Sequence, residues 1–137
     1  MAQIGINQLE DELIEILRRA LTDIEVSAFG DDVENNNLLS AKNKISVQYT
    51  GTNYETPSSV SGVCIQKENK NFDITLINRD LRSSGGIYSL IDRVTETLFG
   101  MMLRHGERVI FVDDNFEDYQ NEVWIYTIQI QLVTTRI

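Results

Sequence analysis

The sequence predicts an α+β fold: a two-layer sandwich in which two helices pack on one face of a mainly antiparallel or mixed sheet. The first observation is the order of the expected elements, which is helix, four strands, helix, two strands. The second is that short polar turns join consecutive strand-like segments, which is typical of antiparallel pairing. The third is that each helix-like segment carries one apolar stripe, so each helix is expected to bury a single face.

Size and composition are those of one globular domain over residues 1–137. Of the 137 residues, 42% are hydrophobic and 24% are charged, which is enough to bury a core without a metal or a disulfide bond. Cys64 is the only cysteine, so an internal disulfide is excluded. The first residues lack a secretory pattern, and no apolar run approaches membrane-spanning length. We expect a soluble protein that stays in the cytoplasm or enters an assembly there.

The charge balance is acidic. The formal net charge is −9 at pH 7, and both halves of the chain carry more acids than bases. Such a surface repels the phosphate backbone, which disfavours ordinary binding of nucleic acid. It remains compatible with a ring whose lumen lets DNA slide through without binding it.

A first amphipathic helix is predicted over residues 6–21. Acidic residues crowd its first half, and Arg18 and Arg19 follow near its end, which is the order that the helix dipole favours. Its apolar residues recur at spacings of three and four and form one stripe. The stripe consists of Leu9, Leu13, Ile16, Leu17, Ala20 and Leu21. We expect the helix to dock through this stripe with its acidic face in water.

Strands are expected next at residues 24–30 and 44–51. In the second of them Ile45, Val47 and Tyr49 alternate with polar residues, as in a half-buried strand. The Asp/Asn-rich residues 31–43 are a predicted loop.

Residues 52–59, which hold the only proline, form a second predicted loop. Residues 60–80 are then expected to form two strands around the turn "KENKN" at 67–71. The aromatic and aliphatic side chains of the second of these strands share one face, and they are Phe72, Ile74 and Leu76.

The second helix is expected after the paired glycines Gly85 and Gly86, with Ser83 or Ser84 as its N-cap. Its apolar positions are Ile87, Leu90, Ile91, Val94, Leu98, Met101 and Met102. A short strand, an acidic connection "DDNFEDYQNE" at 113–122 and a long last strand complete the chain. In the last strand one face holds Trp124, Tyr126, Ile128, Ile130 and Leu132.

Three segments were weighed as chemical sites. "RSSGG", from Arg82 to Gly86, offers arginine and a helix N-terminus to an anion, but it has neither a P-loop lysine nor dinucleotide-motif spacing. His105 is the only histidine, which argues against zinc and against a catalytic triad. The acids of residues 113–122 lack the glycine and ligand order of a calcium loop. We therefore expect no catalytic residue, no metal and no cofactor.

The segment "LINRDLRSSGGIYSLIDRVTETLFG" resembles the central signature of the Mu-like phage tail terminator family. The matching positions are Arg79, Leu81, Arg82, Gly86, Tyr88, Leu90, Asp92 and Val94. The helix "QLEDELIEILRRAL" and the closing "FEDYQNEVWIYTIQIQL" are also similar to that family. The resemblance implies a structural virion protein of a phage tail or neck, assembled in the host cytoplasm.

The resemblance further implies a homo-hexameric ring on the head-proximal end of the tail tube. Such a ring stops tube growth and joins the neck, and in contractile systems it also touches the sheath. Its partners would be itself, the tail tube protein, and sheath and neck proteins, with DNA passing through the lumen. The candidate interface residues are Arg79, Arg82, Tyr54, Asp114 and Glu117.

A bacterial module that binds one partner and forms no ring is one alternative that the sequence leaves open, and two others remain. One is a related head-completion or stopper ring protein, which differs in its partner. The other is a small anion-binding domain or enzyme that uses the helix N-terminus at Arg82–Gly86.

Overall fold

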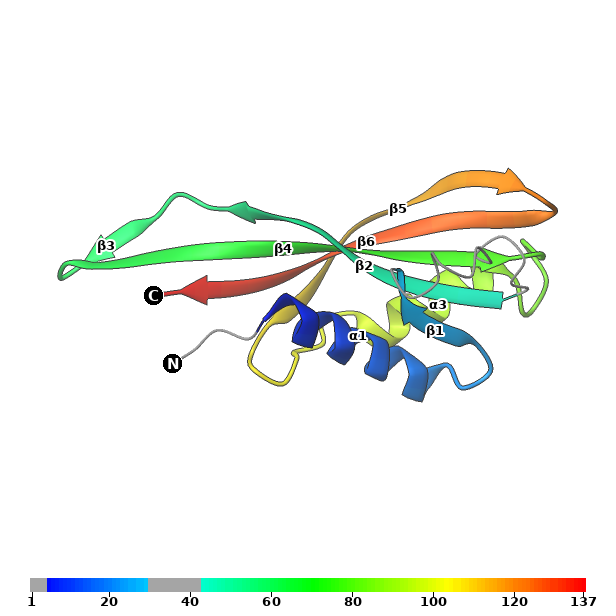
Figure 1. The fold of residues 1–137 in the computed structure, drawn as a ribbon, viewed down its shortest axis with the longest axis horizontal. Coiled ribbons are helices and arrows are strands. Elements are labelled where there is room, and N and C mark those ends of the chain that lie inside the picture. The colour runs from blue at the N-terminus through cyan, green and yellow to red at the C-terminus, as the bar shows by residue number, and fades with distance from the viewer. Residues whose placement is uncertain (1–4, 30–42) are drawn as a thin grey trace.

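A computed structural model describes residues 5–29 and 43–137, which form one sheet with two helices beside it (Figure 1). The elements are α1 (Ile6–Ala20), β1 (Glu25–Ala28), β2 (Asn43–Tyr54), β3 (Ser58–Val60), β4 (Val63–Asn78), α3 (Ile87–Leu98), β5 (Arg108–Gln120) and β6 (Val123–Arg136). The predicted order of helices and strands and the α+β class are confirmed. The predicted loop at 31–43 lies outside the described residues, apart from Asn43 in β2.

The sheet has the strand order β1-β2-β4-β6-β5, and β3 pairs with the beginning of β4. The β1 strand runs parallel to β2, and every other pairing is antiparallel. The sheet is therefore mixed and mainly antiparallel. Both helices cover the same face (Figure 1), as the single stripe on each of them predicts.

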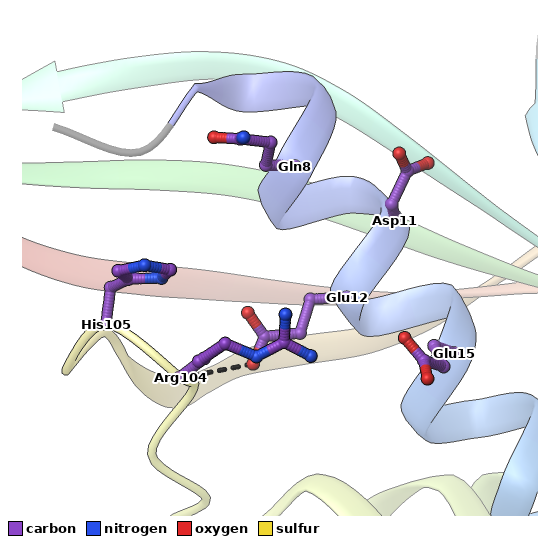
Figure 2. Close-up of a pocket in the computed structure, with 6 residues that line it drawn as sticks. All are labelled: Gln8, Asp11, Glu12, Glu15, Arg104 and His105. Carbon is purple, nitrogen blue, oxygen red and sulfur yellow. Dashed lines mark hydrogen bonds between the residues drawn. The ribbon is translucent and has the colours of Figure 1, made fainter.

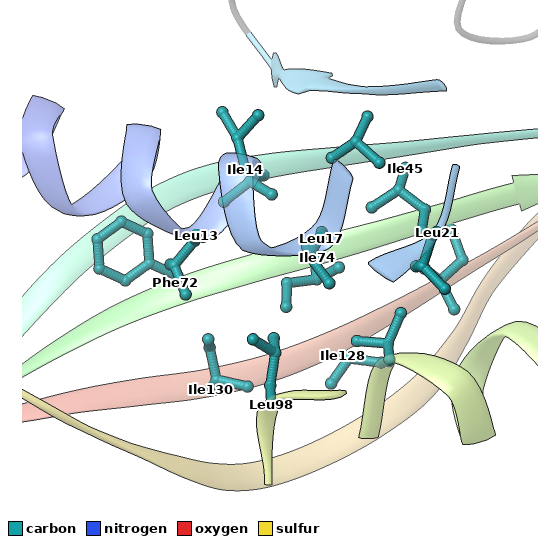
Figure 3. Close-up of a cluster of buried hydrophobic side chains, with 14 of the residues drawn as sticks. Leu13, Ile14, Leu17, Leu21, Ile45, Phe72, Ile74, Leu98, Ile128 and Ile130 are labelled. Atoms are coloured by element: carbon teal, nitrogen blue, oxygen red, sulfur yellow. The ribbon is translucent and has the colours of Figure 1, made fainter. Parts of the chain in front are cut away.

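The core lies between this face and the helices. Leu13 and Leu17 of α1 point toward the sheet, where Phe72 and Ile74 of β4 meet them (Figure 3). The α3 helix contributes the buried residues Ile87, Leu90, Val94 and Leu98. The predicted inward faces of β2, β4 and β6 are confirmed, since Ile45, Val47, Phe72, Ile74, Leu76, Ile128, Ile130 and Leu132 are all buried. Burial of each such side chain stabilises the fold by about 1.5–3 kcal/mol.

The predicted turn at "KENKN" is wrong, because β4 runs without interruption through residues 67–71. The chain reverses earlier, at Ser61 and Gly62, whose φ angles of 52° and 80° suit a two-residue hairpin turn. The polar residues of "KENKN" find partners inside the sheet. Asn71, for example, accepts a hydrogen bond from Gln131 and donates one to Asn53.

The predicted loop at 52–59 is correspondingly short. Residues 52–54 belong to β2 and residues 58–60 form β3, so that only residues 55–57 connect them. We call residues 52–67 the arm. Together with the end of β6, the arm extends the sheet well beyond both helices (Figure 1).

The predicted acidic connection at 113–122 is also a strand. The β5 strand continues to Gln120, and the chain turns at Asn121 and Glu122, both with positive φ. The sheet therefore ends in a β5–β6 hairpin on the side opposite the arm (Figure 1).

A charged triad lies where the arm leaves the core. The Glu68 carboxylate is buried, and it accepts hydrogen bonds from Lys70 Nζ at 2.8 Å and from Arg136 Nε at 2.5 Å. The Arg136 hydrogen bond is the main cause that lowers the pKa of Glu68, burial opposes it, and Lys70 lowers it further. Glu68 therefore stabilises the fold in its ionised form.

We expect Glu68→Gln to lower the free energy of unfolding at pH 7 by about 3 kcal/mol, because the buried Lys70 loses its counter-charge. The folded pKa of Glu68 is depressed, so this stabilisation is present above the unfolded value of about 4.5. It is lost as the pH falls through the folded pKa. Urea unfolding from pH 7 to pH 2 should show the wild type and the variant converging at the acid end.

The exposed neighbour Glu55 provides the control, since among the described contacts its carboxylate accepts a hydrogen bond only from Asn69. Glu55→Gln should change stability by less than about 0.5 kcal/mol. A constant gap between wild type and Glu68→Gln at every pH would contradict the role given to the carboxylate charge.

Candidate functional site

The turn that leads into α3 uses its own carbonyl groups to satisfy the start of the helix. The N–H of Ile87 donates to the Asp80 carbonyl and that of Tyr88 to the Leu81 carbonyl, both at 3.0 Å. The N–H of Gly86 donates to the Ser83 carbonyl at 2.9 Å. These are donors that an anion at a helix N-terminus would need. The segment "RSSGG" is therefore built as a joint between strand and helix.

The predicted N-cap at Ser83 or Ser84 is wrong. The N-cap is Gly86, and no side chain caps the helix. A Cβ at Gly86 would lie 2.9 Å from the Asp80 carbonyl oxygen and from the Leu81 carbonyl. Glycine is thus required here because the turn packs backbone against backbone.

Asn78 holds the same turn from the end of β4. Its side chain is buried. The Nδ2 atom donates hydrogen bonds to the Gly85 carbonyl at 2.7 Å and to Asn43 Oδ1 at 3.1 Å. Its Oδ1 accepts from the N–H of Asp80 at 2.8 Å. One amide side chain therefore ties the turn to two strands.

We expect Gly86→Ala to destabilise the protein by about 1–3 kcal/mol, because the added methyl meets backbone atoms that cannot move aside. Gly85→Ala is the matched control, since a Cβ there has no atom within 4 Å. It should leave stability within about 1 kcal/mol of the wild type. Thermal unfolding of the two variants compares them directly, and equal melting temperatures would contradict this account of the turn.

The five predicted interface residues do not form one site. Arg79 and Arg82 are exposed on the turn before α3, and neither makes an ion pair within the described ranges. Asp114 and Glu117 lie on the edge strand β5, and Tyr54 lies on the arm with 63% of its surface exposed.

A row of aromatic rings, which the sequence pattern does not predict, lies on the β5–β6 hairpin. Tyr119 stacks on Trp124 with ring centroids 4.4 Å apart, and Phe116 lies 6.2 Å from Trp124 and 5.5 Å from Tyr126. Tyr126 then meets Tyr88 of α3 at 6.3 Å. We call these five residues the aromatic ladder. Phe116, Tyr119 and Tyr88 remain about half exposed, so the ladder is an open surface beside α3.

The β-bulge after Phe116 places the rings of Phe116 and Tyr119 on one face. Register shifts fall between Phe111 and Asp113 and between Phe116 and Asp118. Each shift inserts one extra residue, so Phe116 and Tyr119, three positions apart, both oppose inward-facing residues of β6. A regular strand would place residues three apart on opposite faces. The bulges therefore hide the pattern from a search for strict alternation.

One carboxylate lies on the ladder side of the hairpin, and several others lie on the opposite side. Asp114 opposes Ile128 and so lies on the ladder side of the hairpin, whereas Asp113 opposes Gln129 on the other side. Burial is the main cause that raises the pKa of Asp73, and the charges of Glu117 and Asp113 add to it. The hairpin thus presents aromatic rings on one face and mutually repelling acids on the other.

A shallow hollow of about 190 Å³ lies on the acidic side of α1 (Figure 2). Its lining residues are Gln8, Asp11, Glu12, Glu15, Arg104 and His105. Glu12 accepts a hydrogen bond from the Arg104 N–H at 2.7 Å, which ties the loop after α3 to α1. His105 is exposed. Over residues 5–29 and 43–137, no three His, Cys, Asp or Glu side chains are grouped to hold a metal ion.

None of the helices in the described ranges is long and apolar enough to cross a membrane. A family model described as Gp37 protein matches residues 13–137. No curated protein matches the chain. The matched span includes the turn before α3, the arm and the aromatic ladder.

Proposed function

The chain belongs to the Gp37 family, a phage protein family, and from this premise we propose that it is a tail terminator. In this role it forms a hexameric ring that caps the head-proximal end of the tail tube. The ring stops polymerisation of the tube, and of the sheath where one is present, and offers a joining surface to the neck. Its place is the tail or neck of the virion.

The observation that carries the proposal is the pair of exposed apolar surfaces at opposite ends of the sheet. The arm extends past the helices at one end, and the aromatic ladder opens at the other (Figure 1). Aromatic surfaces of this kind are typical of the buried centres of protein interfaces. A subunit with two different interaction surfaces makes head-to-tail contacts with its neighbours. Such contacts close into a ring when the rotation from one subunit to the next divides a full turn evenly.

The charge supports the same role. A net charge of −9 per subunit gives a ring that repels DNA. DNA then crosses the lumen without being bound, as a tail passage requires. No enzymatic activity is proposed for this chain.

The main alternative is a stopper ring on the neck. It has the same ring architecture as a tail terminator but binds the portal side and not the tip of the tail tube. An anion-binding or enzymatic role at Arg82–Gly86 is disfavoured, because the first N–H groups of α3 already donate to Asp80, Leu81 and Ser83. A thermal-shift screen with phosphates and nucleotides tests that alternative, since a ligand of the native state raises stability.

The proposal is tested by polymerising the tail tube protein of the same phage with and without this chain. We expect shorter tubes, each carrying an open six-fold ring at one end in negative-stain images. Rings that bind a neck or portal protein and leave tube length unchanged would favour the stopper. Failure to bind the tube in any form would overturn the proposal.

Arg82→Glu should weaken association of the ring by about tenfold, because we assign Arg82 to an ion pair with an acidic neighbouring subunit. Light scattering over a range of concentrations measures the effect, and circular dichroism should show an unchanged fold. Arg19→Glu is the control, since Arg19 is also exposed but pairs within α1 with Glu15. Identical association of both variants and the wild type would remove Arg82 from the interface.

A further inference from the structure

The arm lacks a second layer of its own. Residues 52–67 lie beyond the helices (Figure 1), and Tyr54, Val60 and Val63 are each 45–63% exposed. A strand ribbon with no packed face is only marginally stable in water. Val60 and Val63 pair directly across the hairpin and share a face, and exposed apolar residues paired on such a ribbon indicate that another protein covers them.

The arm also differs in charge from the rest of the chain. Glu55 and Lys67 are its only charged residues, whereas the whole chain carries a net charge of −9. Close to its base, Arg136 adds a half-exposed positive charge. The arm is therefore the part of the surface that an acidic body repels least.

The aromatic ladder has the complementary properties. Three of its rings are about half exposed, and the carboxylate of Asp114 lies on the same side of the hairpin, because Asp114 opposes Ile128. An apolar strand with positive charge at its base fits such a surface, because the rings contact the apolar side chains and the Asp114 carboxylate attracts the charges of Lys67 and Arg136.

One protomer cannot bring the two surfaces together. The β4 strand begins in the arm at Val63, and its Leu76 pairs with Tyr126 of the ladder. Thirteen residues of strand at about 3.3 Å each separate these positions by about 43 Å. Two copies arranged head to tail have no such restriction.

We infer that the arm of one copy docks on the aromatic ladder of the next, so that the occupant of the ladder is a second copy of this chain. Each subunit then gives one arm and receives one arm, and the contact repeats around a closed ring. The inference rests on the proposed function, because it supplies the contact that the ring needs.

The single cysteine makes the contact directly measurable. Cys64 is exposed on the arm, and Asp114→Cys or Tyr119→Cys adds a thiol at either end of the ladder. Under mild oxidation the two double-thiol proteins are tested by non-reducing gel electrophoresis. At least one of them should give a series of bands that ends at the closed ring.

The controls separate this contact from random oxidation. The wild type and the variants Cys64→Ser/Asp114→Cys and Cys64→Ser/Tyr119→Cys carry one thiol each and should stay monomeric on the gel. Glu96→Cys, which adds an exposed thiol on α3, should give no series beyond background. Rings seen by microscopy without a band series from either ladder position would overturn the inference and leave the proposed function standing.

A mixing experiment gives a second test that does not depend on thiols. Val60→Ser/Val63→Ser alters the arm and leaves the ladder intact, and Phe116→Ser/Tyr119→Ser does the reverse. Each variant alone should be monomeric by light scattering, whereas an equal mixture should stop at dimers. Dimers in the mixture also show that both variants are folded. A mixture that stays monomeric while the wild type forms rings would contradict docking of the arm on the ladder.

Discussion

The hydrogen-bonded pairing of β4 with its neighbouring strands is the constraint on which the rest of the structure depends. This strand of 16 residues pairs with β2, β3 and β6, and it passes from the arm through the core to the joint at Asn78. In its core half, Phe72, Ile74 and Leu76 bind both helices to the sheet. In its other half, polar residues satisfy one another across the strands, so the backbone stays extended where no helix covers it.

The fold class could be predicted because its signals are strong and local. Spacings of three and four along residues 6–21 and 87–98, and alternation at Ile45, Val47 and at Phe72 to Leu76, each follow from which face is buried. The misplaced turn at 67–71 has a clear reason. Lys70 and Asn71 favour turns in isolation, and only pairing with Glu68, Asn53 and Gln131 explains their burial in a strand.

The surface was harder to predict than the core. Tyr54 and the aromatic residues of the last strand were recognisable as unusual, but Phe116 and Tyr119 were hidden by bulges that no sequence period reveals. The joint at Gly86 resembled an anion site because the same residue types serve both purposes. What distinguishes the two is the identity of the acceptors, the carbonyl groups of residues 80 and 81, and these are a property of the folded turn.

In the proposed ring, the arm has a consequence for the order of assembly, because its two charges, Glu55 and Lys67, cancel. Subunits with a net charge of −9 repel one another, but that repulsion fades over about 8 Å at physiological salt. Five residues of strand carry the turn at Gly62 about 17 Å beyond Lys67. The tip of the arm therefore meets a neighbour before the two acidic bodies enter each other's fields. The arm therefore binds the neighbouring subunit before the two acidic bodies come close together. A strongly charged subunit can in this way stay dispersed in solution and still join an assembly.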